Sequence, residues 1–105
     1  MAISKTAQKN HDEPFPNHQS FLAETDPEFI ELFDNFTFDE VLKYSTIDVK
    51  LRMKLTLASL IAMQSVNEYK AMMVGALNVG VSPVEIKEIV YQAVPYAGLG
   101  KVFDC

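Results

Sequence analysis

Cysteine is almost absent from this sequence, since Cys105, the final residue, is the only one. The chain therefore has no internal disulfide and no cysteine pair of the kind that redox motifs require. A lone terminal thiol is usually incidental, so we expect no thiol chemistry.

Positive charge is also scarce, because nine Lys and Arg residues face fourteen Asp and Glu residues, for a net charge of −5. Nucleic-acid affinity depends largely on clustered Lys and Arg. Here Lys50, Arg52 and Lys54 alternate with apolar residues instead of forming a run. We therefore expect no nucleic-acid partner.

Long apolar runs are missing as well. The longest strongly apolar stretch covers residues 55–63, whereas a membrane-spanning helix needs about 20 residues. The N-terminal region has Lys5 and Lys9 but no apolar run after them, unlike a signal peptide. These absences predict a cytoplasmic protein with no membrane partner.

The only two histidines, His11 and His18, lie in a polar region that we interpret as a loose arm or loop over residues 1–19. Either ring is able to serve as an acid, a base or a ligand. No metal-ligand spacing accompanies them, so we expect solvated side chains and no metal site.

The rest of the chain predicts helices only. Asp26 and Pro27 suit the start of a helix, a short helix is expected over residues 38–43, and a long one over about 48–63. Aromatic residues at helical spacing either line an apolar pocket or form core, and we interpret them as core: Phe29, Phe33, Phe36 and Phe38. With no alternating β-type runs, we expect an N-terminal arm or loop over residues 1–25 and a single all-α domain over 26–105.

Residues 68–98 predict one helix, a tight break and a second helix. Gly80 suits the end of the first helix, and Ser82-Pro83-Val84-Glu85 has the pattern of a capping box with Pro at the first helical position. The second helix is amphipathic, but the first has almost no polar face between Lys70 and Asn78. A helix that is apolar all round must be buried on all sides, so we expect packing against copies of the same chain.

Glu68 is the carboxylate of most chemical interest. It opens an otherwise apolar helix, where desolvation is able to raise a carboxyl pKa toward the range of a general acid. The alternative is structural, because an acidic residue in the first turn is favoured by the helix dipole alone.

Two segments resemble the carboxymuconolactone decarboxylase family, part of the alkylhydroperoxidase D-like superfamily: DVKLRMKLTLASLIAM (residues 48–63) and GALNVGVSPVEIKEIVYQAVPYAG (residues 75–98). The resemblance covers roughly residues 26–104. It implies a small helical bundle of the alkylhydroperoxidase D-like type, assembled as a dimer, trimer or hexamer, acting on a small-molecule substrate without a cofactor.

The resemblance implies two alternative chemistries. Peroxidase-type members carry E…CxxC…H, but the cysteine positions here correspond to Ser65 and Glu68, and the histidine position to Met72, so this chemistry is not expected. Decarboxylase-type members carry Glu-x-x-x-His, which here is Glu68 and Met72. Glu68 is then the expected catalytic acid. The thioether of Met72, which stands at the histidine position, carries no charge and donates no proton.

Loss of carbon dioxide from a lactone acid leaves negative charge on the ring carbonyl, and a cation or hydrogen-bond donor must hold that charge. Because Met72 is unable to do so, other residues must supply this group. The substrate-binding candidates are Met72 itself, Arg52 and Tyr96, with Lys70, Tyr69 and His18 of a neighbouring copy as further alternatives. Two functions follow: a cofactor-free lyase acting on a small lactone or organic acid, or a non-catalytic oligomer that binds a small molecule or a partner protein.

Overall fold

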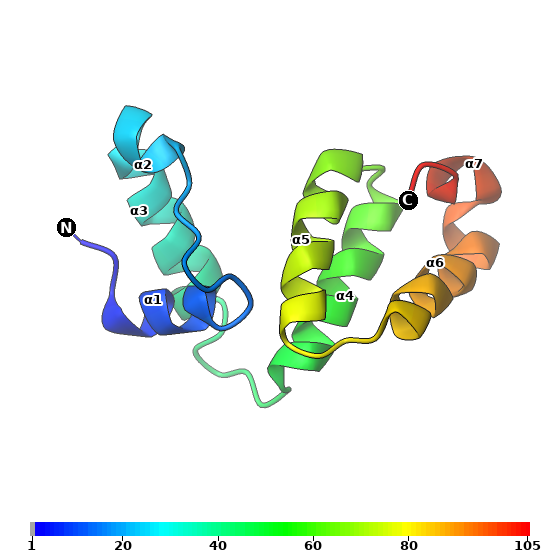
Figure 1. The fold of residues 1–105 in the computed structure, drawn as a ribbon, viewed down its shortest axis with the longest axis horizontal. Helices are drawn as coiled ribbons and strands as arrows, with labels where there is room; N and C mark the ends of the chain where they lie inside the picture. The colour runs from blue at the N-terminus through cyan, green and yellow to red at the C-terminus, as the bar shows by residue number, and fades with distance from the viewer. Residues whose placement is uncertain (1) are drawn as a thin grey trace. The chain divides into compact units, whose positions relative to one another are not determined.

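The structure, a computed structural model, describes residues 2–105, and every regular element in that range is a helix (Figure 1). This confirms the all-α prediction. The elements are α1 (Lys5–Asp12), α2 (Leu22–Thr25), α3 (Pro27–Asn35), the π-helix η1 (Phe36–Glu40), α4 (Val49–Ala62), α5 (Val66–Asn78), α6 (Pro83–Ala97) and α7 (Leu99–Val102). The chain forms two compact units, Met1–Thr46 and Ile47–Cys105. In the described residues, no helix combines the length and apolarity needed to cross a membrane.

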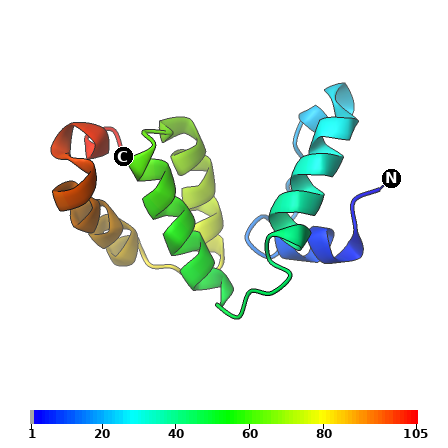
Figure 2. The ribbon, with the colours of Figure 1, turned by 180° about the vertical axis from the view of Figure 1, so that it is seen from behind.

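The second unit is built around α4. Asp48 caps this helix by accepting a hydrogen bond of 2.8 Å from the Leu51 N–H, as expected from its place before an apolar run. Helices α4 and α5 run side by side in opposite directions (Figures 1 and 2), and α6 and α7 also pack on α4. The buried side chains of this unit are Met53, Leu57, Ile61, Tyr69, Ala76, Val81, Ile86 and Val102.

The link between α5 and α6 has the predicted form. Gly80 has φ of +95°, which favours glycine, and the Val81 N–H donates to the Ala76 carbonyl at 3.0 Å as α5 ends. At the start of α6, the Glu85 N–H donates to Ser82 Oγ at 3.1 Å, and the Ser82 N–H donates to Glu85 Oε1 at 3.0 Å. The capping box is therefore confirmed, and local hydrogen bonds satisfy both helix ends.

A single chain buries only part of α5. Gly75 and Ala76 are buried, but Val74 is 53% exposed and Leu77 is 43% exposed. Within one chain, α4 packs along only one side of α5, so burial of the remaining apolar side chains against a second copy stays a prediction.

The first unit corrects the predicted loop, because residues 5–12 form helix α1. Ser4 caps it by accepting a hydrogen bond from the Ala7 N–H at 3.0 Å. The Ser4 N–H also donates to Asn35 Oδ1 at 2.8 Å, and Ser4 Oγ donates to Asp39 Oδ2 at 2.7 Å. Contacts with residues far along the chain thus hold a polar helix that has no apolar stripe of its own.

Helix α3 begins at Pro27 as predicted, although the Asp26 side chain accepts no capping hydrogen bond. The short helix predicted over residues 38–43 is wrong, because α3 continues directly into η1 and the chain then leaves the helix. The aromatic core is also wrong for most of its members: Phe29, Phe33 and Phe36 are exposed and Phe38 is half-buried. Too few elements pack around α3 in this unit to cover a full aromatic side.

Candidate functional site

Glu68 lies in the first turn of α5, and its side chain is exposed. Within residues 2–105, no hydrogen bond or ion pair engages its carboxylate. The carboxylate is therefore available to a ligand. The desolvation on which its predicted acid role depends is not supplied by the chain alone.

The predicted substrate-binding residues do not gather around Glu68. Met72 follows it by one helical turn and is half-buried, so the two side chains share a face of α5. Arg52 lies half-buried on α4, and Tyr96 lies near the end of α6 with 87% of its surface exposed. In the part of the chain that the structure describes, no hydrogen bond or ion pair joins Glu68 to either of them.

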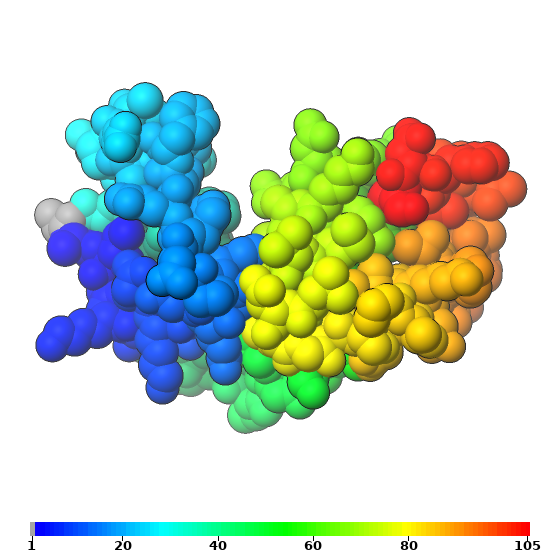
Figure 3. Space-filling model, viewed as in Figure 1, coloured from blue at the N-terminus to red at the C-terminus, as the bar shows by residue number. Residues whose placement is uncertain are grey.

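A groove with a volume of about 500 Å³ lies between α5, α6 and the C-terminal residues of the second unit. Its lining is mostly apolar and consists of Tyr69, Lys70, Met73, Leu77, Pro83, Ile86, Lys87, Val90, Tyr91, Asp104 and Cys105. On the face shown in Figure 3, the C-terminal residues, in red, border both α5 and α6. None of the four predicted site residues lines this groove, although the two residues that follow Glu68 do.

The groove has a simple sequence pattern along each wall. Tyr69, Met73 and Leu77 lie four residues apart on α5, and Lys87 and Tyr91 lie four apart on α6. Residues at that spacing share a helix face. Sequence reasoning missed the groove because the same spacing is also typical of core residues, and because Asp104 and Cys105 join it only through the fold.

Burial dominates the electrostatics of the groove. It raises the pKa of the Tyr69 hydroxyl, to which the nearby Cys105 adds a smaller contribution. It also raises the pKa of the Cys105 thiol, with a further increase from Asp104 and a partial offset from the charge of Lys70. The tyrosine therefore stays protonated over a wide pH range and is able to act as a hydrogen-bond donor.

An ion pair links α4 to the start of α6. Lys54 Nζ pairs with Glu85 Oε2. This hydrogen bond, together with the backbone hydrogen bond from Ser82, lowers the pKa of the Glu85 carboxyl to about 2. The pair joins the two helices beside the capping box, next to Pro83 and Ile86 of the groove lining.

A family model, that of the carboxymuconolactone decarboxylase family, matches residues 27–105. The chain belongs to this family. The matched region runs from α3 to α7 and contains Glu68, Met72 and the whole groove. No curated protein matches the chain.

The two histidines lie outside the region matched to the carboxymuconolactone decarboxylase family, and the structure brings them together. His18 Nδ1 lies 3.4 Å from His11 Nε2, and His11 Nδ1 lies 3.0 Å from Asp12 Oδ1. The His11 side chain is only 13% exposed, so the prediction of a solvated ring is wrong for His11 and holds for the exposed His18. Burial raises the pKa of Asp34, and both histidines partly offset that increase.

Among the described residues, no three His, Cys, Asp or Glu side chains come together in a way that could hold a metal ion. The histidine pair therefore consists of two rings and a carboxylate in series. Such a series is able to pass a proton. Neither histidine lines the first-unit pocket formed by Leu32, Asn35, Phe36 and Glu40.

Proposed function

We propose that this member of the carboxymuconolactone decarboxylase family is a cofactor-free carboxy-lyase acting on a small lactone or organic acid, with Glu68 as the proton donor. The observation that carries the proposal is the family match across α5, combined with a Glu68 carboxylate that forms no hydrogen bond or ion pair with any described residue. Family membership supports a small lactone or organic acid as the substrate, and the free carboxyl group supports Glu68 as the proton donor.

The proposed reaction breaks the bond between a ring carbon and the carboxylate. Carbon dioxide leaves, and the electron pair moves into conjugation with the ring carbonyl, whose oxygen takes up the negative charge. Glu68 then returns a proton to carbon. A cation or hydrogen-bond donor must hold the developing charge, and Met72 is unable to do so. The candidates for this role are Arg52, Tyr96, Lys70, Tyr69 and His18 of a second copy.

We also propose that the protein is a homo-oligomer. The exposed Val74 side chain of α5 supports this proposal, because exposed apolar surface is stabilised by burial. A second copy that also covered the first turn of α5 would remove water from the neighbourhood of Glu68 and supply the desolvation that a single chain lacks. We further propose a cytoplasmic enzyme that needs neither metal nor cofactor.

The test is a Glu68→Gln variant assayed for carbon dioxide release from small lactone acids. General acid catalysis typically contributes about 10²- to 10⁴-fold to the rate, so we expect a loss of roughly that size. The matched control is Glu88→Gln, which removes an exposed carboxylate of α6 and should leave turnover unchanged. Absence of turnover by the parent protein, or equal turnover by Glu68→Gln, would contradict the proposal.

A second candidate function is a non-catalytic binding protein that keeps the family fold. Met72 favours it, because a half-buried thioether forms an adaptable apolar wall where the decarboxylase pattern places histidine. The variant Met72→His separates the two candidates. Activity gained on introducing histidine would show that this position lacked a catalytic group, whereas ligand binding without turnover in the parent would support the binding function.

A further inference from the structure

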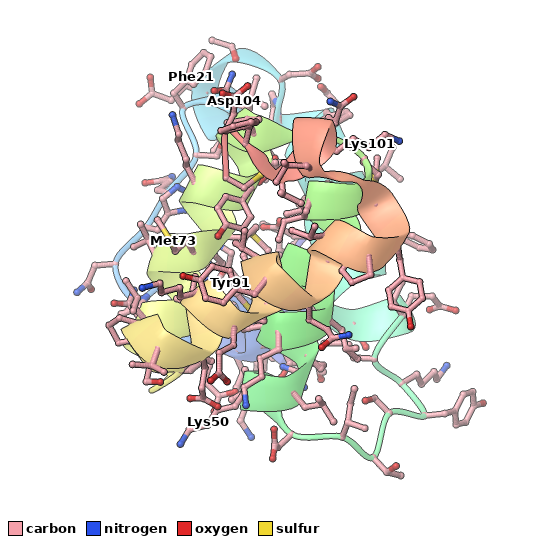
Figure 4. All side chains as sticks on the ribbon, turned by 90° about the vertical axis from the view of Figure 1, so that its right-hand side faces the viewer. Phe21, Lys50, Met73, Tyr91, Lys101 and Asp104 are labelled. Carbon is pink, nitrogen blue, oxygen red and sulfur yellow. The ribbon has the colours of Figure 1, made fainter. Side chains whose placement is uncertain are left out.

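The groove between α5 and α6 has the dimensions of a small-molecule site. Its volume of about 500 Å³ falls within the roughly 300–1,000 Å³ typical of ligand pockets. Met73 of α5 and Tyr91 of α6, both labelled in Figure 4, lie on its two walls. Such walls suit an apolar or aromatic body.

A free hydrogen-bond donor lies in this apolar lining. The Tyr69 side chain belongs to a residue that is only 4% exposed, and within residues 2–105 no hydrogen bond engages its hydroxyl. Yet no buried side-chain nitrogen or oxygen of the described residues lacks a partner. The hydroxyl must therefore meet solvent, and Tyr69 is one of the residues that line the groove.

Each wall also contributes a cation. Lys70 extends from α5 and Lys87 from α6, where its Nζ lies 5.6 Å from the centre of the Tyr91 ring. No ion pair joins either ammonium group to a carboxylate of the described chain. Asp104 is the single acidic side chain in the lining, so two ammonium groups and one side-chain carboxylate border the groove.

We propose that this groove binds a small organic acid with an apolar or aromatic body, whose carboxylate is held by Lys70, Lys87 and the Tyr69 hydroxyl. The inference rests on the proposed function, since both concern a small organic acid, and it assigns the binding site to the residues that follow Glu68. Charged hydrogen bonds from two sides fix the head of the ligand, while Met73, Leu77 and Tyr91 contact its body.

The experiment titrates the full-length ¹⁵N-labelled protein with 2-naphthoate and, separately, with the neutral isostere 2-naphthamide, at low ionic strength. Amide shifts should map to residues of the groove. Naphthoate should bind about tenfold more tightly than naphthamide, because exposed charge contacts contribute roughly two- to fivefold each. Equal affinity of the two compounds, or shifts confined to other surfaces, would overturn the proposal, as would the absence of any groove shift because a second copy covers it.

Charge variants provide the second measurement. The double variant Lys70→Gln/Lys87→Gln should bind naphthoate about tenfold more weakly and leave naphthamide binding unchanged. The matched control, Lys50→Gln/Lys101→Gln, also removes two positive charges, but from positions away from Met73 and Tyr91 in Figure 4. An equal loss in the control would show a general effect of net charge and refute the site.

The naphthoate titration and the lyase assay test the two proposals separately. If naphthoate binds in the groove while no lactone acid is turned over, the binding site stands and the carboxy-lyase proposal fails. If turnover depends on Glu68 but the lysine variants bind naphthoate as the parent does, the lyase proposal stands and the groove is not its binding site.

Tyr69→Phe removes the hydroxyl alone and should weaken naphthoate binding about threefold, on the scale of one hydrogen bond.

Discussion

Replacing Leu57 with alanine should destabilise the second unit strongly. Leu57 is 0% exposed in the middle of α4, where α5 and α6 both pack. Removing three carbon groups at about 0.8 kcal/mol each forfeits about 2.4 kcal/mol of transfer free energy. A residual cavity of about 50 Å³ adds roughly 1 kcal/mol, so the free energy of unfolding should fall by about 3–4 kcal/mol.

Leu55→Ala is the matched control, because the same side chain is shortened in the same helix two residues away, where it is 52% exposed. Helix propensity then changes equally in both variants, and only burial differs. Urea denaturation followed by circular dichroism measures the two losses, and the melting temperature of Leu57→Ala should fall by roughly 10–25 °C. A loss below about 1 kcal/mol for Leu57→Ala, or equal losses for both variants, would refute this account of the core.

Three further predictions concern the link between α5 and α6. Ser82→Ala removes the cap of α6 and should lower the free energy of unfolding by about 1 kcal/mol in urea denaturation; no loss would show that the cap is redundant. Glu85→Gln should be less stable than the parent at neutral pH. Pairing with Lys54 lowers the folded-state pKa of Glu85 from 4.5 to about 2. The ionised Glu85 therefore stabilises the fold above pH 4.5, and this stabilisation is lost as the pH falls toward 2. In a pH series of denaturation curves, the difference in stability between parent and variant should shrink over that window. Gly80→Ala should cost about 1–2 kcal/mol, since φ is +95° and the new Cβ would lie 3.1 Å from Lys50 Cε, whereas Gly100→Ala meets no atom within 4 Å and should be neutral or slightly stabilising by the same measurement.

The part of the fold that was predictable is the part specified by local contacts. The capping box of Ser82 and Glu85 and the positive φ of Gly80 involve residues within a few positions of one another, so sequence spacing alone indicates them. Helix α1 was not predictable in this way. It has no apolar stripe, and its hydrogen bonds reach from Ser4 to Asn35 and from Asn10 to Phe38, contacts that exist only once the unit has folded.

The same distinction applies to the candidate site. Glu68 and Met72 were identifiable as a pair through the Glu-x-x-x-His pattern of the family that the sequence resembles, and their spacing keeps them on one face of α5. The groove depends on Lys70, Lys87 and Asp104, which come from three separate segments. Their proximity is a property of helix packing, so no spacing rule along the chain could have grouped them.

The link between α5 and α6 also bears on how the chain reaches its folded state. Its hydrogen bonds join residues 75–82 to one another and Ser82 to Glu85, and so few intervening residues cost little loop-closure entropy. Contacts this local form quickly, because folding rates rise as the sequence separation of contacting residues falls. We therefore expect the link to form early in folding, so that it limits the directions from which α5 and α6 reach the helix on which both pack, α4.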